Sequence, residues 1–193
     1  SLGKPVALSF GGARRDRYGR WLAHLNVQNE DGTTTWIQGD MLRQGLARVY
    51  SFADNRSKVP EMLALEREAR SAQRGIWSLP YYAIRNPDAA LLGDLLGTFQ
   101  IVEGRVVKAA HVKGTGYLNF GSDWRTDFTI MISRNVLKLC HEVSLAPEDW
   151  SGKSNRVRGW PPKPNGPMIS ATHPEQIQWL DRSSGTPNLN ITN

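Results

Sequence analysis

Cysteine is almost absent from the sequence, since Cys140 is the single one among 193 residues. An intrachain disulfide is therefore excluded, and a lone cysteine in an apolar segment is typical of a small core residue. Long hydrophobic runs are missing too, because no stretch approaches the roughly 18 apolar residues of a membrane-spanning helix. The four histidines lie far apart, and none has a partner at the spacing of a metal site.

The overall charge is positive, with 24 Lys and Arg against 18 Asp and Glu and a formal net charge of +6 at pH 7. The hydrophobic fraction of 39% and the charged fraction of 22% are ordinary for a globular protein. A chain of 193 residues suits one or two domains with a sizeable core. Because a positive field favours encounter with phosphate backbones, the composition favours an anionic partner such as nucleic acid.

Arginine is concentrated in one short turn, which Gly19 closes just before an apolar strand begins at Trp21. The planar guanidinium group suits two phosphate oxygens at once and stays charged at any ordinary pH. The pattern therefore predicts a phosphate contact. A solvated basic loop is the alternative interpretation. The arginines of this turn are Arg14, Arg15, Arg17 and Arg20.

The clearest helix is predicted after Pro60, which suits the first turn of a helix, and Gly75 ends it. Glu66 and Arg70 form an i,i+4 pair within it. The charges of this helix are interpreted as its solvated face. Its apolar residues recur at helical spacing and are Leu63, Ala69, Ala72 and Ile76.

The order of the segments around the arginine turn is more specific than the turn alone. It consists of the turn Asp16-Arg17-Tyr18-Gly19-Arg20, an apolar strand, an Asp31-Gly32 turn, a short helix, Gly45-Leu46-Ala47 and a helix ending in Ile76-Trp77. In this order the segments resemble the latter half of a staphylococcal nuclease-like (thermonuclease) domain over residues 4–80. The resemblance implies a partial OB-type nuclease-like domain with two helices in residues 1–80.

The resemblance also implies an activity, calcium-dependent hydrolysis of DNA or RNA phosphodiesters by water. Arg20 matches the arginine that stabilises charge on the phosphate in the transition state. Arg17 and Tyr18 match neighbouring positions that contact the bound nucleotide. Tyr50 and Phe52 fall near two tyrosines that line the substrate pocket, with hydrophobic anchoring of their loop as the alternative interpretation.

The same resemblance exposes a missing metal site. In the family, the calcium-binding aspartates and the catalytic glutamate lie on strands that precede this region, whereas Lys4 already matches a mid-domain strand. Ca²⁺ is thus implied, but its ligands are not present. Since Ser1 is not an initiator methionine, we expect a processed or truncated form with weak or no activity. A secreted or periplasmic location is compatible with the family.

A change in composition predicts a second domain. Residues 81–97 are expected to be a linker with a short helix, residues 98–180 an OB-like domain and residues 181–193 a disordered tail. The order strand, strand, strand, helix, strand, strand is that of a five-stranded OB barrel. This part resembles the OB-like unit found after some bacterial thermonuclease domains. The whole fold is therefore expected to be α+β and mainly β.

Basic and aromatic residues of the second domain are candidates for a nucleic-acid-binding face, because OB folds often bind oligonucleotides through such a sheet face. Tyr117 and Phe120 have opposite strand parity, so at least one is expected to point into the barrel. A structural or protein-binding module is the alternative. The candidates are Tyr117, Phe120, Trp124, Arg125, Arg156 and Arg158.

The sequence is therefore compatible with two functions of different classes. One is a nuclease-like phosphodiesterase, and the other is a non-catalytic nucleic-acid- or protein-binding module in which Arg20 contributes only affinity. An incomplete barrel would also leave strand edges unpaired near Lys4 and Trp21, and such edges favour self-association.

Overall fold

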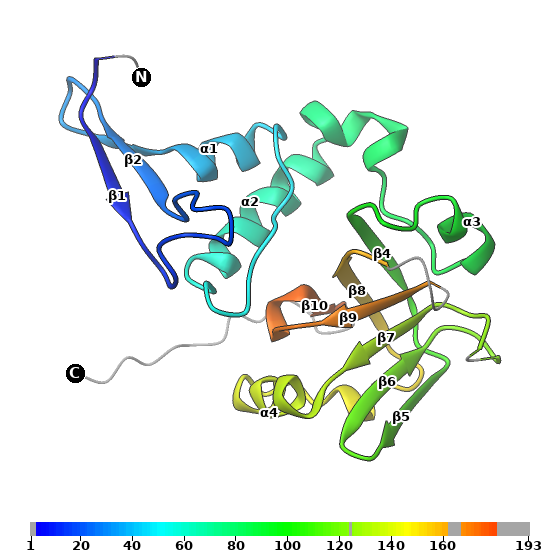
Figure 1. Ribbon diagram of the computed structural model, residues 1–193. Helices are drawn as coiled ribbons and strands as arrows, with labels where there is room; N and C mark the ends of the chain where they lie inside the picture. Colours follow the sequence, from blue (N-terminus) through cyan, green and yellow to red (C-terminus); the bar gives the residue numbers. More distant parts are fainter. Residues whose placement is uncertain (1–2, 124, 162–166, 181–193) are drawn as a thin grey trace. The chain divides into compact units, whose positions relative to one another are not determined.

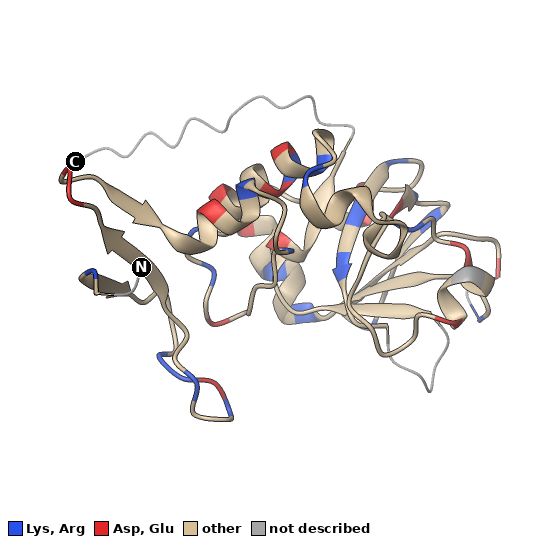
Figure 2. Ribbon diagram, turned by 90° about the horizontal axis from the view of Figure 1, so that it is seen from above, with Lys and Arg blue, Asp and Glu red and all other residues tan. Residues whose placement is uncertain are grey.

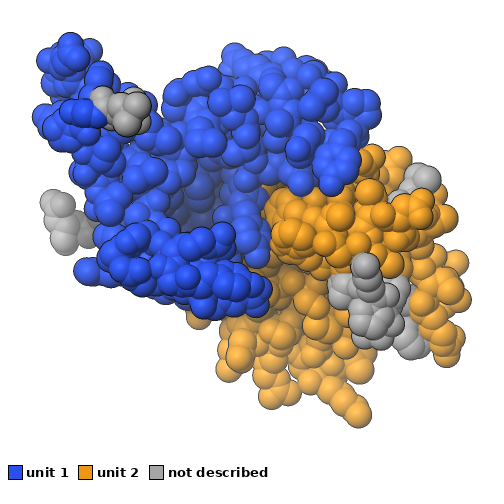
Figure 3. All heavy atoms as spheres, turned by 45° about the horizontal axis from the view of Figure 1, so that its top comes forward, with its two compact units in different colours: residues 1–83 blue, residues 84–193 orange. Residues whose placement is uncertain are grey.

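The computed structural model describes residues 3–123, 125–161 and 167–180. Trp124 and the predicted disordered tail lie outside the described residues. The chain divides into two compact units, residues 1–83 and residues 84–193 (Figures 1 and 3). Strands predominate over helices, which confirms the predicted α+β, mainly β class. In the described part of the chain, no helix combines the length and apolar character that crossing a membrane requires.

One antiparallel sheet forms the first part of unit 1, in the order β1 (Val6–Ser9), β2 (His24–Gln28), β3 (Thr34–Trp36) (Figure 1). The Asp31 carboxylate accepts two hydrogen bonds from Thr33 in the turn between β2 and β3. Residues 10–23 connect β1 to β2 and contain the arginine turn. The sheet thus holds both ends of that turn.

Two close-packed glycines explain two short motifs of unit 1. Gly45 follows α1 (Ile37–Arg43), and Gly75 follows α2 (Val59–Ser71). The Ile76 N–H donates to the Gly45 carbonyl at 2.8 Å, and both glycines have positive φ, 73° and 53°. A Cβ on Gly45 would lie 2.2 Å from the Arg74 carbonyl oxygen. Only glycine fits both positions, and this backbone contact fixes the ends of the two helices against each other.

Glu66 corrects the interpretation of α2 as a helix whose charges are all solvated. Its side chain is fully buried, and its carboxylate accepts hydrogen bonds from the Val49 backbone at 2.7 Å and from Arg70 at 3.2 Å. A buried carboxylate is stable only when it is paired in this way. Glu66 therefore anchors the segment that leads into Tyr50, and Arg70 neutralises it.

Unit 2 contains two sheets, which a bent segment connects. β4 (Gln100–Arg105) and β5 (Lys108–Val112) are separated by only two residues, and they belong to different sheets. The first sheet has the order β10-β8-β4, with β10 (Ile177–Trp179) and β8 (Ser154–Gly159). The second has the order β5-β6-β7-β9, with β6 (Thr115–Asn119), β7 (Thr129–Ile132) and β9 (Met168–Ala171).

The predicted closed five-stranded barrel is not found among the described residues. The predicted order of elements is present, α4 (Arg134–Glu142) lies between β7 and β8, and β7 pairs in parallel with β9. β8, however, pairs with β4 along one edge and with β10 along the other. A strand has only two edges, so β10 takes the edge that a ladder between β8 and β9 would need. The sequence pattern did not predict β10.

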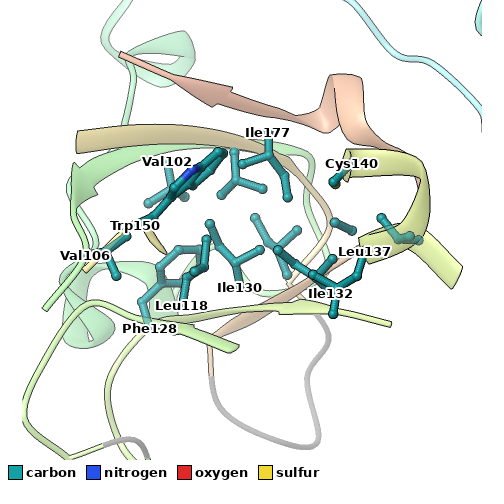
Figure 4. Packing of buried hydrophobic residues seen from close by; sticks show 14 of the residues in the cluster. Val102, Val106, Leu118, Phe128, Ile130, Ile132, Leu137, Cys140, Trp150 and Ile177 are labelled. Atoms are coloured by element: carbon teal, nitrogen blue, oxygen red, sulfur yellow. The ribbon is translucent and has the colours of Figure 1, made fainter. Parts of the chain in front are cut away.

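The core of unit 2 lies between its sheets and α4 (Figure 4). Val102 of β4, Leu118 of β6 and Ile130 of β7 are almost completely buried. Cys140 on α4 is fully buried in this core, which confirms its interpretation as a core residue. The short helix α3 (Ala89–Gly93), within the predicted linker, also contributes Leu92 to this core.

The burial of Glu66 predicts a large effect on stability. Glu66→Ala is expected to lower the free energy of unfolding by about 3–5 kcal/mol, because it leaves Arg70 and the Val49 N–H without this buried partner. Urea unfolding monitored by circular dichroism measures the change. Glu68→Ala removes an exposed carboxylate from the same helix and is expected to change stability by less than about 0.5 kcal/mol. Equal effects of the two substitutions would contradict the anchoring role.

Candidate functional site

The arginine turn is organised by the carboxylate of Asp16. Its Oδ1 accepts hydrogen bonds from the backbone N–H groups of Tyr18 and Arg20, both at 2.9 Å. Its Oδ2 accepts a hydrogen bond from Arg20 Nε at 2.6 Å. Gly19 completes the turn with a positive φ of 77°. One side chain thus fixes both the backbone of the turn and the position of Arg20. In the loop at the bottom of Figure 2, basic segments (blue) flank an acidic one (red).

Asp16 is mostly enclosed, whereas Arg20 projects into solvent. The Asp16 side chain is 13% exposed and that of Arg20 is 75% exposed. Desolvation raises the pKa of Asp16, but hydrogen bonds from the Arg20 backbone and side chain and from Tyr18, together with the Arg20 charge, lower it below 3.8. Asp16 is therefore ionised at neutral pH. Since this contact uses Nε and the side chain is mostly exposed, the two terminal nitrogens of Arg20 remain accessible to a phosphate.

Tyr18 lies between two of the arginines. The guanidinium carbon of Arg17 is 4.7 Å from the centre of the Tyr18 ring, and that of Arg20 is 5.4 Å from it. Tyr18 is 67% exposed, so its ring and hydroxyl face solvent beside both cations. The structure thus brings three predicted site residues, Arg17, Tyr18 and Arg20, into one exposed group.

Tyr50 and Phe52 form a second group on the loop before α2. Their ring centres are 4.7 Å apart in an edge-to-face arrangement, and Tyr50 is half exposed. An isolated bridge between Gly12 and Asn55 joins this loop to the segment that leads into the arginine turn. A Cβ on Gly12 would lie 1.7 Å from the Asp54 carbonyl oxygen, so the two backbones are in close contact. The loop that carries Tyr50 and Phe52 is therefore in direct backbone contact with the segment that precedes the arginine turn.

His24 supports the same loop from the sheet. Its Nδ1 accepts a hydrogen bond from the Trp36 indole at 3.2 Å, which requires an unprotonated Nδ1. Desolvation, followed by the nearby Lys58 charge, lowers the pKa of His24 below 6.5, although Ser57 and Glu61 act in the opposite direction. Lys58 in turn lies 4.5 Å from the centre of the Trp36 ring. A neutral His24 thus belongs to the packing that positions residues 57 and 58.

The described residues do not fit a calcium site. They contain no group of three or more His, Cys, Asp or Glu side chains that could hold a metal ion. Asp16 is the only carboxylate in the arginine turn, and it is hydrogen-bonded to Arg20. The resemblance to calcium-dependent enzymes therefore has no matching ligand set in the described part of the chain.

The aromatic candidates of unit 2 lie in different surroundings. Tyr117 on β6 is half-buried and lies opposite Ala110 and Met131 in the register of its sheet. Phe120 is also half-buried, and its ring lies 5.2 Å from that of the core residue Phe128. Trp124 lies outside the described residues. Phe120 thus contributes to packing, while Tyr117 lies on the other side of its sheet from the buried Leu118.

The three arginine candidates of unit 2 do not form a common exposed face with Tyr117. Arg125 is exposed in a loop, where its backbone donates to Asp123. Arg156 binds Glu103 with two hydrogen bonds, of 3.0 and 2.6 Å, and Arg158 is only 1% exposed. Arg156 and Arg158 also lie on β8, in the sheet that does not contain Tyr117. The candidates are therefore dispersed.

Unit 1 is a small sheet with two helices. It presents an arginine that is held by a carboxylate and lies beside an exposed aromatic ring, and this arrangement suits a phosphate ligand. Residues 4–79 match the family model described as staphylococcal nuclease homologue. This region is therefore a staphylococcal nuclease-like domain, as the resemblance of residues 4–80 predicted.

Three relatives match a part of the chain of similar length. Endonuclease YncB of Bacillus subtilis (strain 168) is 40% identical over 72 residues, 37% of this chain and 32% of the relative. The SPbeta prophage-derived endonuclease YokF of the same organism is 41% identical over 68 residues, 35% of this chain and 21% of the relative. Protein ParB of Escherichia coli is 37% identical over 70 residues, 34% of this chain and 39% of the relative. The match thus spans between a fifth and two fifths of these relatives.

The lowered pKa of His24 predicts a pH dependence of stability. The unfolded chain gains a proton on His24 at a higher pH than the folded chain, so this contribution is complete above about pH 6.5 and is lost as the pH falls below it. Thermal unfolding between about pH 5 and pH 8 measures the effect. His24→Gln should flatten the profile, whereas His111→Gln, at an exposed position on β5, should leave it unchanged. Parallel profiles of wild type and His24→Gln would contradict the role of His24.

Proposed function

We propose that residues 4–79 bind a phosphodiester of DNA or RNA at Arg20 and stabilise it during hydrolysis. The observation that supports this role is the Asp16–Arg20 pair, in which a carboxylate holds a mostly exposed guanidinium group through Nε. Negative charge builds up on the phosphate oxygens as water attacks. A fixed bidentate donor then binds the transition state more strongly than the ground state.

The other exposed residues of the site contribute binding in this proposal. Arg17 adds positive charge beside Arg20, and Tyr18 offers its hydroxyl and ring to the same ligand. The edge-to-face pair Tyr50 and Phe52 offers an aromatic surface for a base or sugar. If the reaction requires calcium, as the family resemblance implies, its ligands come from groups outside the described residues. The chain alone is therefore expected to hydrolyse nucleic acid only weakly.

A non-catalytic binding module is the second candidate function. Tyr117 has two cross-strand neighbours in the sheet β5-β6-β7-β9, Met131 on β7 and Ala110 on β5. Tyr117 and Met131 are half-buried and lie side by side on the outer face of this sheet. An apolar surface of this kind can bind a nucleic-acid base or another protein. In this alternative, Arg20 increases affinity for nucleic acid and has no effect on turnover.

The proposal predicts a selective effect of Arg20 on the chemical step. Arg20→Ala is expected to lower the single-turnover rate of DNA or RNA hydrolysis in calcium by about 10²–10³-fold, because one transition-state donor is lost. The control Arg67→Ala removes an exposed arginine of α2 and should leave the rate unchanged. A gel assay with excess protein, with and without chelator, detects weak activity.

The outcomes of this assay separate the two candidate functions. Loss of rate in Arg20→Ala with little loss of binding supports the phosphodiesterase. Folded wild-type protein that binds nucleic acid without any calcium-dependent cleavage contradicts catalysis by this chain and favours the binding module.

We also propose that β1 mediates self-association. Among the described strands β1 pairs only with β2, so its other edge is open, and Val6 and Leu8 on it are 46% and 47% exposed. An exposed apolar edge strand favours pairing with a second copy. Leu8→Lys is therefore expected to shift the protein from dimer toward monomer in analytical ultracentrifugation, whereas Val143→Lys, at an exposed position just after α4 and outside any strand, should not. A monomeric wild-type protein at all concentrations would contradict this proposal.

A further inference from the structure

The register of the arginine turn places a second arginine against an exposed tryptophan. Arg15 and Trp21 face each other in an isolated antiparallel bridge, and the Leu22 N–H donates to the Arg14 carbonyl at 2.9 Å. The guanidinium carbon of Arg15 lies 3.9 Å from the centre of the Trp21 ring. Arg15 also donates a hydrogen bond to the Gly19 carbonyl at 2.8 Å. Arg15 is therefore held both on the indole ring and against the turn.

A second cation–aromatic pair lies beside the first. The Phe10 ring is 5.7 Å from the Trp21 ring, and the guanidinium carbon of Arg14 lies 5.1 Å from the centre of the Phe10 ring. Trp21 is 55% exposed, and both arginines are exposed as well. We call these four residues, Phe10, Arg14, Arg15 and Trp21, the Trp21 cluster.

The chemistry of the Trp21 cluster suits a base and its phosphate. Arg15 covers one face of the Trp21 indole, and the ring is 55% exposed, so its other face offers a flat surface on which any nucleobase can stack. A guanidinium group stacked on a ring keeps N–H donors at its edge, and these can bind phosphate oxygens. The charge of the turn favours a polyanion, since the one acidic residue among residues 10–21 is Asp16, which is already bound to Arg20.

We propose that the Trp21 cluster is a stacking subsite for an unpaired nucleobase, next to the phosphate site at Arg20. In a duplex the faces of the bases are covered by their neighbours, so only an unpaired base can lie on Trp21. The inference rests on the proposed function in one respect, because it takes Arg20 to hold the neighbouring phosphate.

The test compares oligothymidylate with an abasic oligonucleotide of equal length, which has the same phosphates but no bases. Affinities are measured for the whole chain by fluorescence anisotropy in chelator, so that no hydrolysis occurs. Wild type should bind oligothymidylate more tightly. Trp21→Leu should weaken this binding by about 5- to 150-fold, to the level of the abasic strand, and should leave abasic binding unchanged.

Three further variants sharpen the test. Trp21→Phe keeps an aromatic ring and should retain most of the preference, which separates stacking from a folding defect. Trp160→Leu is the control, because Trp160 is 51% exposed and its ring centre lies 5.9 Å from that of Phe99. It should leave the affinity for both strands unchanged. Arg14→Gln should weaken binding of both strands and reduce the steepness of the salt dependence by about 0.7 in log–log slope.

Equal affinity of wild type for the two strands would overturn the subsite, as would equal weakening of both strands by Trp21→Leu. Competition by polyglutamate as effective as that by oligothymidylate would also overturn it, in favour of an acidic protein partner. A selective effect of Trp21 without any effect of Arg20 on hydrolysis would support the subsite and contradict the proposed catalytic role. Failure to bind either strand would contradict both.

Discussion

The Asp16 carboxylate is the interaction on which the candidate site depends. It accepts two backbone hydrogen bonds within the turn and a third from the Arg20 side chain. Without it, the four arginines of the turn would repel one another, and Arg20 would be free to sample many rotamers. The acidic residue thus has a structural task in a basic turn, since it sets the direction in which the positive charge points.

Close backbone contacts at three glycines hold the loops and helix ends of unit 1 together. Gly45 and Gly75 allow the ends of α1 and α2 to approach, and Gly12 allows the loop after Tyr50 to lie against the segment before the turn. Glu66 holds the same region from α2 through Val49. The loop that carries Tyr50 and Phe52 is therefore held by the Gly12–Asn55 bridge and by the hydrogen bond between Val49 and Glu66. The candidate site consists of loops that such contacts fix to the sheet and helices of unit 1.

Local patterns in the sequence predicted what local chemistry determines. The turn from Asp16 to Arg20, the helix after Pro60 and the core position of Cys140 follow from spacing and composition. Contacts between distant residues could not be predicted in this way. The pairing of Arg156 with Glu103, the buried partner of Glu66 and the edge of β8 taken by β10 each depend on strand register or on packing across many residues. The stacking of Arg15 on Trp21 is local, but it depends on the bridge register within the turn, which residue spacing alone does not determine.

The most direct test of the account is the affinity of Asp16→Ala for single-stranded nucleic acid, compared with wild type and Arg20→Ala. Simple electrostatics predicts tighter binding by Asp16→Ala, because a negative charge is removed from a basic turn. The account predicts weaker binding instead, since Arg20 loses its fixed direction, and no further loss when Asp16→Ala is combined with Arg20→Ala. Tighter binding, or fully additive losses, would contradict the view that Asp16 acts by positioning Arg20.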